Sequence, residues 1–101
     1  MLFRSNDVTV IDATNNTVVT TVPVVNSSRG IVVNPGGTRA YVAINGGNQI
    51  VAINTSNNTV ATTIASGGVG PYGAAVNPAG TRLYVTNRNS NSVTVDRKSV
   101  V

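Results

Sequence analysis

The chain has 101 residues, enough for one small domain, and its formal net charge at pH 7 is +4. It contains no cysteine, which excludes disulfides and thiol chemistry, and no histidine. No apolar run approaches the ~20 residues that a membrane-spanning helix needs, so we expect no membrane span in this segment. Val, Thr, Asn and Gly are abundant, which favours strands joined by tight turns.

Short runs of Val, Ile, Thr and Ala alternate with turns along the whole chain, and no stretch shows helical periodicity. These runs predict nine strands, over 7–11, 17–22, 30–33, 39–44, 49–53, 59–64, 73–76, 82–86 and 92–95. The turns at 34–37 and 77–80 place Asn first, Pro second and Gly fourth. Because proline presets φ and glycine accepts a left-handed conformation, both segments predict hairpin turns.

The elements recur with a period of 42 to 43 residues. Residues 15–22 return as 57–64, and residues 30–42 return as 73–85. Four antiparallel strands in about 40–45 residues is the spacing of a propeller blade. The sequence therefore predicts an all-β fold, a β-propeller fragment of about two and a quarter four-stranded antiparallel blades. In chain order it contains the last two strands of one blade, a complete blade, and the first three strands of another.

Strand composition favours a propeller over other β folds. Residues 40–44 and 50–53 are almost continuously apolar, as expected for strands covered on both faces, whereas a sandwich should show clean alternation. The small residues of 73–75 suit the innermost strand of a blade, where blades converge on the central channel. A β-solenoid is the main alternative, but its coils are usually shorter and would not need two hairpin turns of this kind.

The two ends of the chain differ from the repeat. Residues 1–5 and 96–101 match translations of common sequencing-adapter DNA, and we expect both to be artefacts flanking the repeat region 6–95; ordinary terminal residues are the alternative. Without them the net charge falls to +2, and the remaining four arginines do not cluster, so we expect no nucleic-acid partner. We expect residues 6–95 alone to aggregate, because the flanking part-blades expose apolar faces and open strand edges.

Residues 84–87 read Tyr-Val-Thr-Asn, and with them the chain resembles the YVTN-family β-propeller repeats. Residues 71–83 resemble the rest of that repeat, as do residues 16–19 after 10–12, although the earlier copy of the name motif is degenerate, Tyr-Val-Ala-Ile at 41–44. The resemblance implies a closed propeller, commonly seven-bladed, of the type found in archaeal surface-layer and other secreted or cell-envelope proteins. It brings no catalytic residue, because the repeat's characteristic positions are structural.

Residues with reactive side chains are scarce. The only acids of the repeat region are Asp7 and Asp12, whereas an acid–base pair, a metal site or a nucleophilic triad needs more. We expect Asp12 to stabilise its turn by hydrogen bonding, and Tyr41 and Tyr84, which share a repeat position, to pack between blades. The sequence therefore predicts that the chain is not an enzyme and that it holds no cofactor and no metal.

Loops most often carry ligand binding, and the connections that precede the first strand and follow the second strand of each blade lie at one end. Arg29, Asn45, Tyr72 and Arg88 stand there and are the candidate binding residues. We expect a binding or structural scaffold, extracellular or in the cell envelope, whose partners are a protein or glycan and the remaining blades of its parent. The alternative is a lactonase-like or haem-associated enzyme whose active-site residues lie outside this segment.

Overall fold

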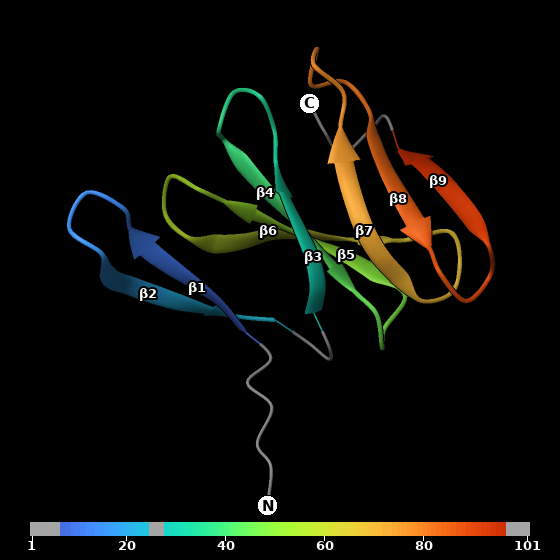
Figure 1. Cartoon of the computed structure of the whole chain (residues 1–101), viewed down its shortest axis with the longest axis horizontal. Coiled ribbons are helices and arrows are strands. Elements are labelled where there is room, and N and C mark those ends of the chain that lie inside the picture. Colours follow the sequence, from blue (N-terminus) through green and yellow to red (C-terminus); the bar gives the residue numbers. More distant parts are fainter. Residues whose placement is uncertain (1–6, 25–27, 97–101) are drawn as a thin grey trace, which may run out of the picture.

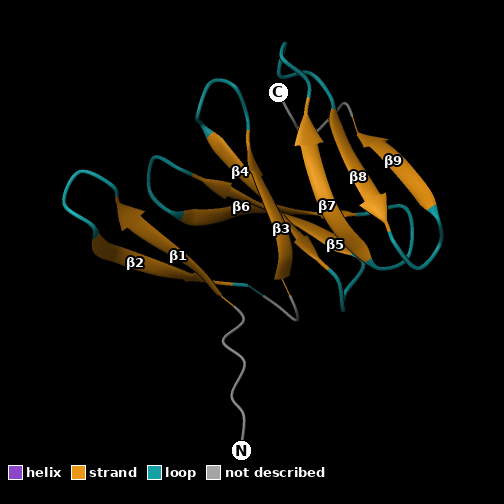
Figure 2. Cartoon of the chain, in the orientation of Figure 1, coloured by secondary structure: helices purple, strands orange, loops and turns teal. Residues whose placement is uncertain are grey.

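The computed structural model describes residues 7–24 and 28–96, which form nine strands in three antiparallel sheets (Figures 1 and 2). The strands are β1 (Asp7–Asp12), β2 (Thr17–Pro23), β3 (Ser28–Val33), β4 (Arg39–Ile44), β5 (Gln49–Asn54), β6 (Thr59–Ala65), β7 (Pro71–Val76), β8 (Leu83–Asn87) and β9 (Ser92–Asp96). All nine predicted strands are present, and each begins and ends within two residues of its predicted bounds. The described residues contain no helix and hence none that could cross a membrane.

The sheets group the strands as the repeat predicts. Their strand orders are β1-β2, β3-β4-β5-β6 and β7-β8-β9, so every pair of neighbours is also consecutive in the chain. Irregularities in register recur with the same period: the β1–β2 pairing shifts between Val10 and Ile11, and the β5–β6 pairing shifts between Ala52 and Ile53. A β-bulge is a regular structural feature rather than a defect, and its recurrence at the same repeat position shows that the two units share one backbone geometry.

The middle sheet is covered on both faces, which explains its continuous apolar strands. One face packs against the first sheet and contributes Ala40, Val42, Ile44, Val51 and Ile53 to a cluster with Val22 and Val24. The other face packs against the third sheet and contributes Tyr41, Ala43, Ile50 and Ala52 to a cluster with Leu83 and Val85. The predicted packing between blades is confirmed for Tyr41, whereas Tyr84 is 37% exposed because no sheet of the described residues covers its face.

Turn chemistry also repeats. The Asn34 side chain accepts hydrogen bonds from the backbone N–H groups of Thr38 and Arg39 and donates one to the Thr38 hydroxyl, and Asn77 makes the same three bonds one repeat later. Gly37 closes the first of these turns with a φ of 70°. The left-handed conformation that the glycine position predicts is therefore present.

The predicted artefact segments fall largely outside the described residues. Residues 1–5 and 97–101 are not described, and the origin of both ends stays a prediction. Asp96 is the last residue of β9 and pairs with Leu83, one residue beyond the predicted end of that strand.

Candidate functional site

The four candidate binding residues occupy two repeat positions. Arg29 and Tyr72 are the second residues of β3 and β7, and Asn45 and Arg88 directly follow β4 and β8. Each pair is separated by 43 residues, the offset of the repeat. The site is therefore made from one position on the innermost strand of a blade and one position in the loop after its second strand.

Backbone hydrogen bonds hold the loops of this end together. Ser66 N donates to Asn48 O over 3.0 Å, which joins the β6–β7 connection to the β4–β5 turn. Gly70 N donates to Asn48 Oδ1 over 2.9 Å, and Arg88 N donates to Gly70 O over 2.9 Å. The three connections thus lie at one end of the molecule, as predicted, and Arg88 is fixed at its backbone.

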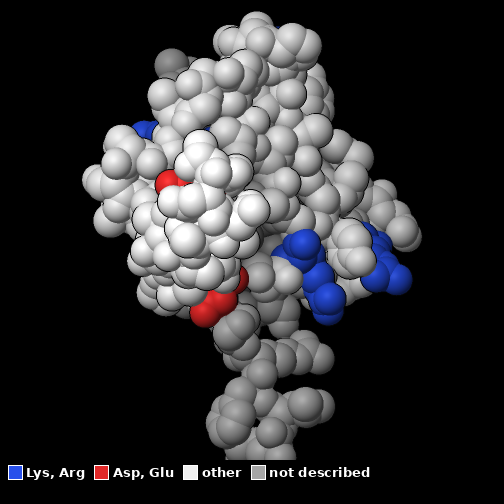
Figure 3. All heavy atoms as spheres, turned by 60° about the vertical axis from the view of Figure 1, so that its left-hand side comes forward, with Lys and Arg blue, Asp and Glu red and all other residues white. Residues whose placement is uncertain are grey.

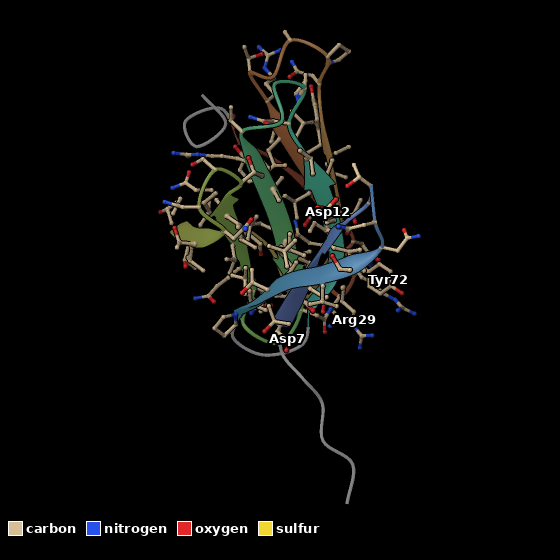
Figure 4. The ribbon with its side chains drawn as sticks, turned by 90° about the vertical axis from the view of Figure 1, so that its left-hand side faces the viewer. Asp7, Asp12, Arg29 and Tyr72 are labelled. Carbon is tan, nitrogen blue, oxygen red and sulfur yellow. The ribbon has the colours of Figure 1, made fainter. Side chains whose placement is uncertain are left out.

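Three of the four candidate side chains meet at one aromatic ring. The guanidinium carbon of Arg88 lies 5.2 Å from the centroid of the Tyr72 ring, and that of Arg29 lies 6.0 Å from it. Both distances are in the range of cation–π attraction. Figure 4 shows Arg29 and Tyr72 next to each other, and Tyr72 is 45% exposed. We call this cluster the Arg–Tyr–Arg stack.

Asn45 supports the stack without joining it. Its Nδ2 donates to the carbonyl oxygen of Pro71 over 3.3 Å, and Pro71 directly precedes Tyr72. The amide therefore ties the loop of the middle blade to the start of β7. Asn45 is a positioning residue for Tyr72 in this arrangement.

A close approach of two backbones lets residues of different sheets share one ring. A Cβ atom on Gly30 would lie 2.6 Å from the carbonyl oxygen of Tyr72 and 3.3 Å from the Cα of Gly73, so only glycine fits there. Figure 1 shows β3 beside β7, the innermost strands of the middle and third sheets. Gly30 thereby brings the neighbouring Arg29 within reach of Tyr72.

Positive charge gathers at this end. Figure 3 shows two groups of basic atoms close together at the lower right of the molecule. Within the described residues, neither Arg29 nor Arg88 forms an ion pair with a carboxylate. Asp7 of β1 and Arg29 of β3 line the same open pocket of about 190 Å³, whose remaining lining includes Val8, Ile31 and Val42.

Asp12 has the structural role that the sequence predicts. Its Oδ1 accepts hydrogen bonds from the Thr14 hydroxyl over 2.5 Å and the Thr14 N–H over 2.9 Å. The hydroxyl bond, followed by the backbone bond, lowers the pKa of Asp12 from its ordinary value of 3.8 because both favour the charged form. Figure 4 labels Asp7 and Asp12 at opposite ends of β1, and no three His, Cys, Asp or Glu side chains of the described ranges gather to hold a metal ion.

Sequence reasoning missed the burial of Asn87. This residue ends the Tyr-Val-Thr-Asn motif, is 1% exposed, and stands at the repeat position of Ile44, in the core. Its Nδ2 donates to Thr94 Oγ1 over 2.9 Å, while its Oδ1 has no partner among the described residues. A Cβ atom on Gly68 would lie 2.5 Å from Asn87 Cγ, so the β6–β7 connection closes directly over this amide. The sequence did offer a signal for this burial, because Asn87 stands at the repeat position that Ile44 occupies in the other unit.

No family model matches this sequence, and no curated protein matches it. Solved structures do: hydrazine synthase of Kuenenia stuttgartiensis is similar with a TM-score of 0.87 and 23% identity over 92% of this chain. The WD40 beta propeller domain of Doa1 follows with 0.76 and 12% over 93%, and AztD of Citrobacter koseri with 0.73 and 16% over 98%. This chain spans 27%, 31% and 29% of those three chains. The likeness shows the fold: the chain is a β-propeller fragment.

Proposed function

We propose that this chain belongs to a non-catalytic β-propeller that acts as a binding scaffold, and that the end carrying the Arg–Tyr–Arg stack is its binding surface. The stack itself carries the proposal. Two neighbouring sheets contribute cationic side chains to one partly exposed ring, and both guanidinium groups face that ring rather than a carboxylate within the described residues. At the opposite end, by contrast, the side chains of the turn asparagines form hydrogen bonds within their own turns.

The two repeats differ where the site lies. The Asn-Pro-x-Gly turn, the threonine and arginine after it, and the following tyrosine are the same in both repeats. The site positions are not: Arg29 corresponds to Tyr72, and Asn45 corresponds to Arg88. Since both repeats build the same backbone, the fold does not dictate the residue at these two positions. They are available for recognition, and conserved structure with variable loop residues is how binding scaffolds are organised.

The proposed setting is a secreted or cell-envelope protein, and the proposed partner is a protein. Support comes from the resemblance of residues 71–87 to repeats found in surface-layer proteins. A recovered parental gene tests the setting: a tagged product on intact cells should be accessible to added protease. Protection of the tag until the cells are broken would refute it.

An enzymatic parent is the second candidate. It is kept as a candidate because one of the similar solved structures, hydrazine synthase, is named as an enzyme. In this case the active-site residues lie on blades outside the present chain, and this segment serves as part of the support. Fold likeness by itself does not distinguish the two, since one propeller framework hosts unrelated functions.

Arrays of synthetic peptides and of glycans, probed with the labelled chain, test the scaffold proposal. We expect retention on peptides, and recovery of each bound ligand with its mass unchanged. Retention on neither array would refute a binding role for this segment. A ligand that returns with an altered mass would instead support the enzymatic candidate.

A further inference from the structure

We infer that Arg29, Tyr72 and Arg88 form a carboxylate-binding site for an acidic peptide segment. This inference rests on the proposed binding function and names the chemistry of its ligand. The site is shared by two blades, because Arg29 lies on β3 of the middle sheet and the other two residues belong to the third sheet.

The charges of the stack call for an anion. Two guanidinium groups lie 5.2 and 6.0 Å from one ring centroid, so both charges act on the same small region. Asp7, which shares a pocket with Arg29, is the only acidic side chain beside the stack in the described part of the chain, and it pairs with neither arginine. Carboxylates of an acidic peptide can pair with each guanidinium group, whose planar fork matches the two carboxylate oxygens.

The occupied ring argues against a sugar as the main ligand. A sugar binds an aromatic residue by stacking on an open face, and the guanidinium groups 5.2 and 6.0 Å from the Tyr72 ring centroid restrict access to that ring. Nucleic acid is also a poor fit. A protein that binds a duplex commonly makes about 6–10 phosphate contacts, and this site offers two guanidinium groups.

The strands beneath the stack suit a peptide. β3 and β7 are the edge strands of their sheets, and they carry Arg29 and Tyr72 next to their starts. Edge strands present backbone N–H and C=O groups that an extended peptide can bind, while its side chains provide specificity. The Tyr72 carbonyl is an exception, because Gly30 of β3 lies against it. A glutamate or aspartate of such a peptide reaches the guanidinium groups from the side that faces solvent.

Affinity measured with two peptides tests the inference. The fluorescently labelled full chain, at a concentration at which sedimentation shows no aggregate, is titrated with a short peptide containing a run of glutamates, and with the same peptide carrying glutamines. The glutamate peptide should bind, and the glutamine peptide should bind at least about tenfold more weakly, since a charged hydrogen bond is worth that much. Raising NaCl from about 50 mM to about 500 mM should lower the affinity of the glutamate peptide, because salt screens interactions between exposed charges.

Substitutions then locate the site. Arg29→Gln and Arg88→Gln should each weaken binding about tenfold, and Arg88→Lys should fall between, because lysine keeps the charge but lacks the planar fork. Tyr72→Phe should keep binding within about twofold, whereas Tyr72→Leu, which removes the ring that orders both arginines, should weaken it severalfold. Arg82→Gln is the matched control: it removes the same charge beside the turn at the opposite end of β8, and should leave affinity unchanged. Circular dichroism verifies that each variant keeps its β structure.

Four results would overturn the inference. Equal binding of the glutamine peptide would show that the site does not recognise carboxylates. An Arg82→Gln effect equal to that of Arg88→Gln would show that the peptide is attracted only by the overall charge of the chain. Tighter binding of a uronate glycan or a single-stranded oligonucleotide through the same residues would replace the peptide. If the chain binds peptides on the arrays but the stack variants bind them equally well, the inference fails and the scaffold function stands.

Discussion

Two tyrosines at one repeat position offer an internal comparison of buried and open blade faces. Tyr41 is fully buried between the middle and third sheets, whereas Tyr84, 43 residues later, is 37% exposed. Leu83 and Val85 flank Tyr84 in β8 but point to the other face, where they meet the middle sheet. We therefore expect Tyr41→Ala to destabilise the chain much more than Tyr84→Ala.

The difference can be estimated from burial. Truncating a fully buried large aromatic side chain to alanine lowers the free energy of unfolding by about 3–5 kcal/mol through lost burial and a residual cavity. Tyr84 has neighbours on one side and solvent on the other, so its truncation should lower that free energy by about 1 kcal/mol. A domain of this length is stable by about 5–15 kcal/mol in total, so Tyr41→Ala should remove a large fraction of it.

Guanidinium denaturation of both variants and the parent chain measures the effect. With a denaturant slope of about 3 kcal/mol/M, Tyr41→Ala should lower the midpoint by about 1–1.7 M and Tyr84→Ala by about 0.3 M. Equal shifts would refute the assigned packing. Sedimentation at two protein concentrations is the control, because a second copy covering the Tyr84 face would also make the shifts equal.

Three smaller predictions concern turns and loops. Gly68→Ala should lower the free energy of unfolding by about 1–3 kcal/mol, because the new Cβ would lie 2.5 Å from Cγ of buried Asn87. Gly36→Ala, whose Cβ would have its nearest atom at 4.0 Å, should be neutral or stabilising by up to about 1 kcal/mol. Thermal melts compare the two variants. Asn77→Ala should lower that free energy by about 1–2 kcal/mol in denaturant unfolding, since three hydrogen bonds of its turn are lost. The lowered pKa of Asp12 predicts that its ionised carboxylate adds to the free energy of unfolding above pH 3.8, and that this gain is lost as the pH falls through the lowered pKa of the folded state. The melting temperature of Asp12→Asn should therefore drop less on acidification than that of the parent chain. An equal drop would contradict this.

The strands could be predicted because the repeat supplies each signal twice. The turn at 34–37 and its copy at 77–80 fix the first hairpin of each blade, and the period then places the remaining strands by analogy. The middle sheet could be predicted to be covered on both faces because its apolar runs lack alternation. What failed was conformational detail: four asparagines, at 16, 48, 58 and 91, adopt a positive φ between 50° and 60° in turns where sequence reasoning assigned no left-handed residue. Asparagine tolerates that region through local hydrogen bonding, a weaker signal than glycine.

Candidate residues could be chosen from sequence, but their contacts could not. The sequence placed all four in loops, which is wrong for Arg29 and Tyr72, because β3 and β7 each begin two residues earlier than predicted. The repeat offset alone shows that the four form two pairs. The stack, however, depends on how closely β3 passes β7, and this separation is set by Gly30 against a carbonyl of the neighbouring sheet. A contact across two sheets has no periodic signature in the chain, because it arises from blade packing rather than from local structure.

The same geometry makes the two site positions informative in any further blade of this period. The position after the first residue of the innermost strand and the position after the second strand lie at one end of every such unit, since the shared turns and bulges fix the backbone. Between the two neighbouring sheets, Tyr72 and Arg88 come from the third sheet and its following loop, and Arg29 comes from the sheet before it. On the proposed function, substituting these positions would alter recognition without touching the turns or the core, so a propeller of this design could change its ligand while its fold stays constant.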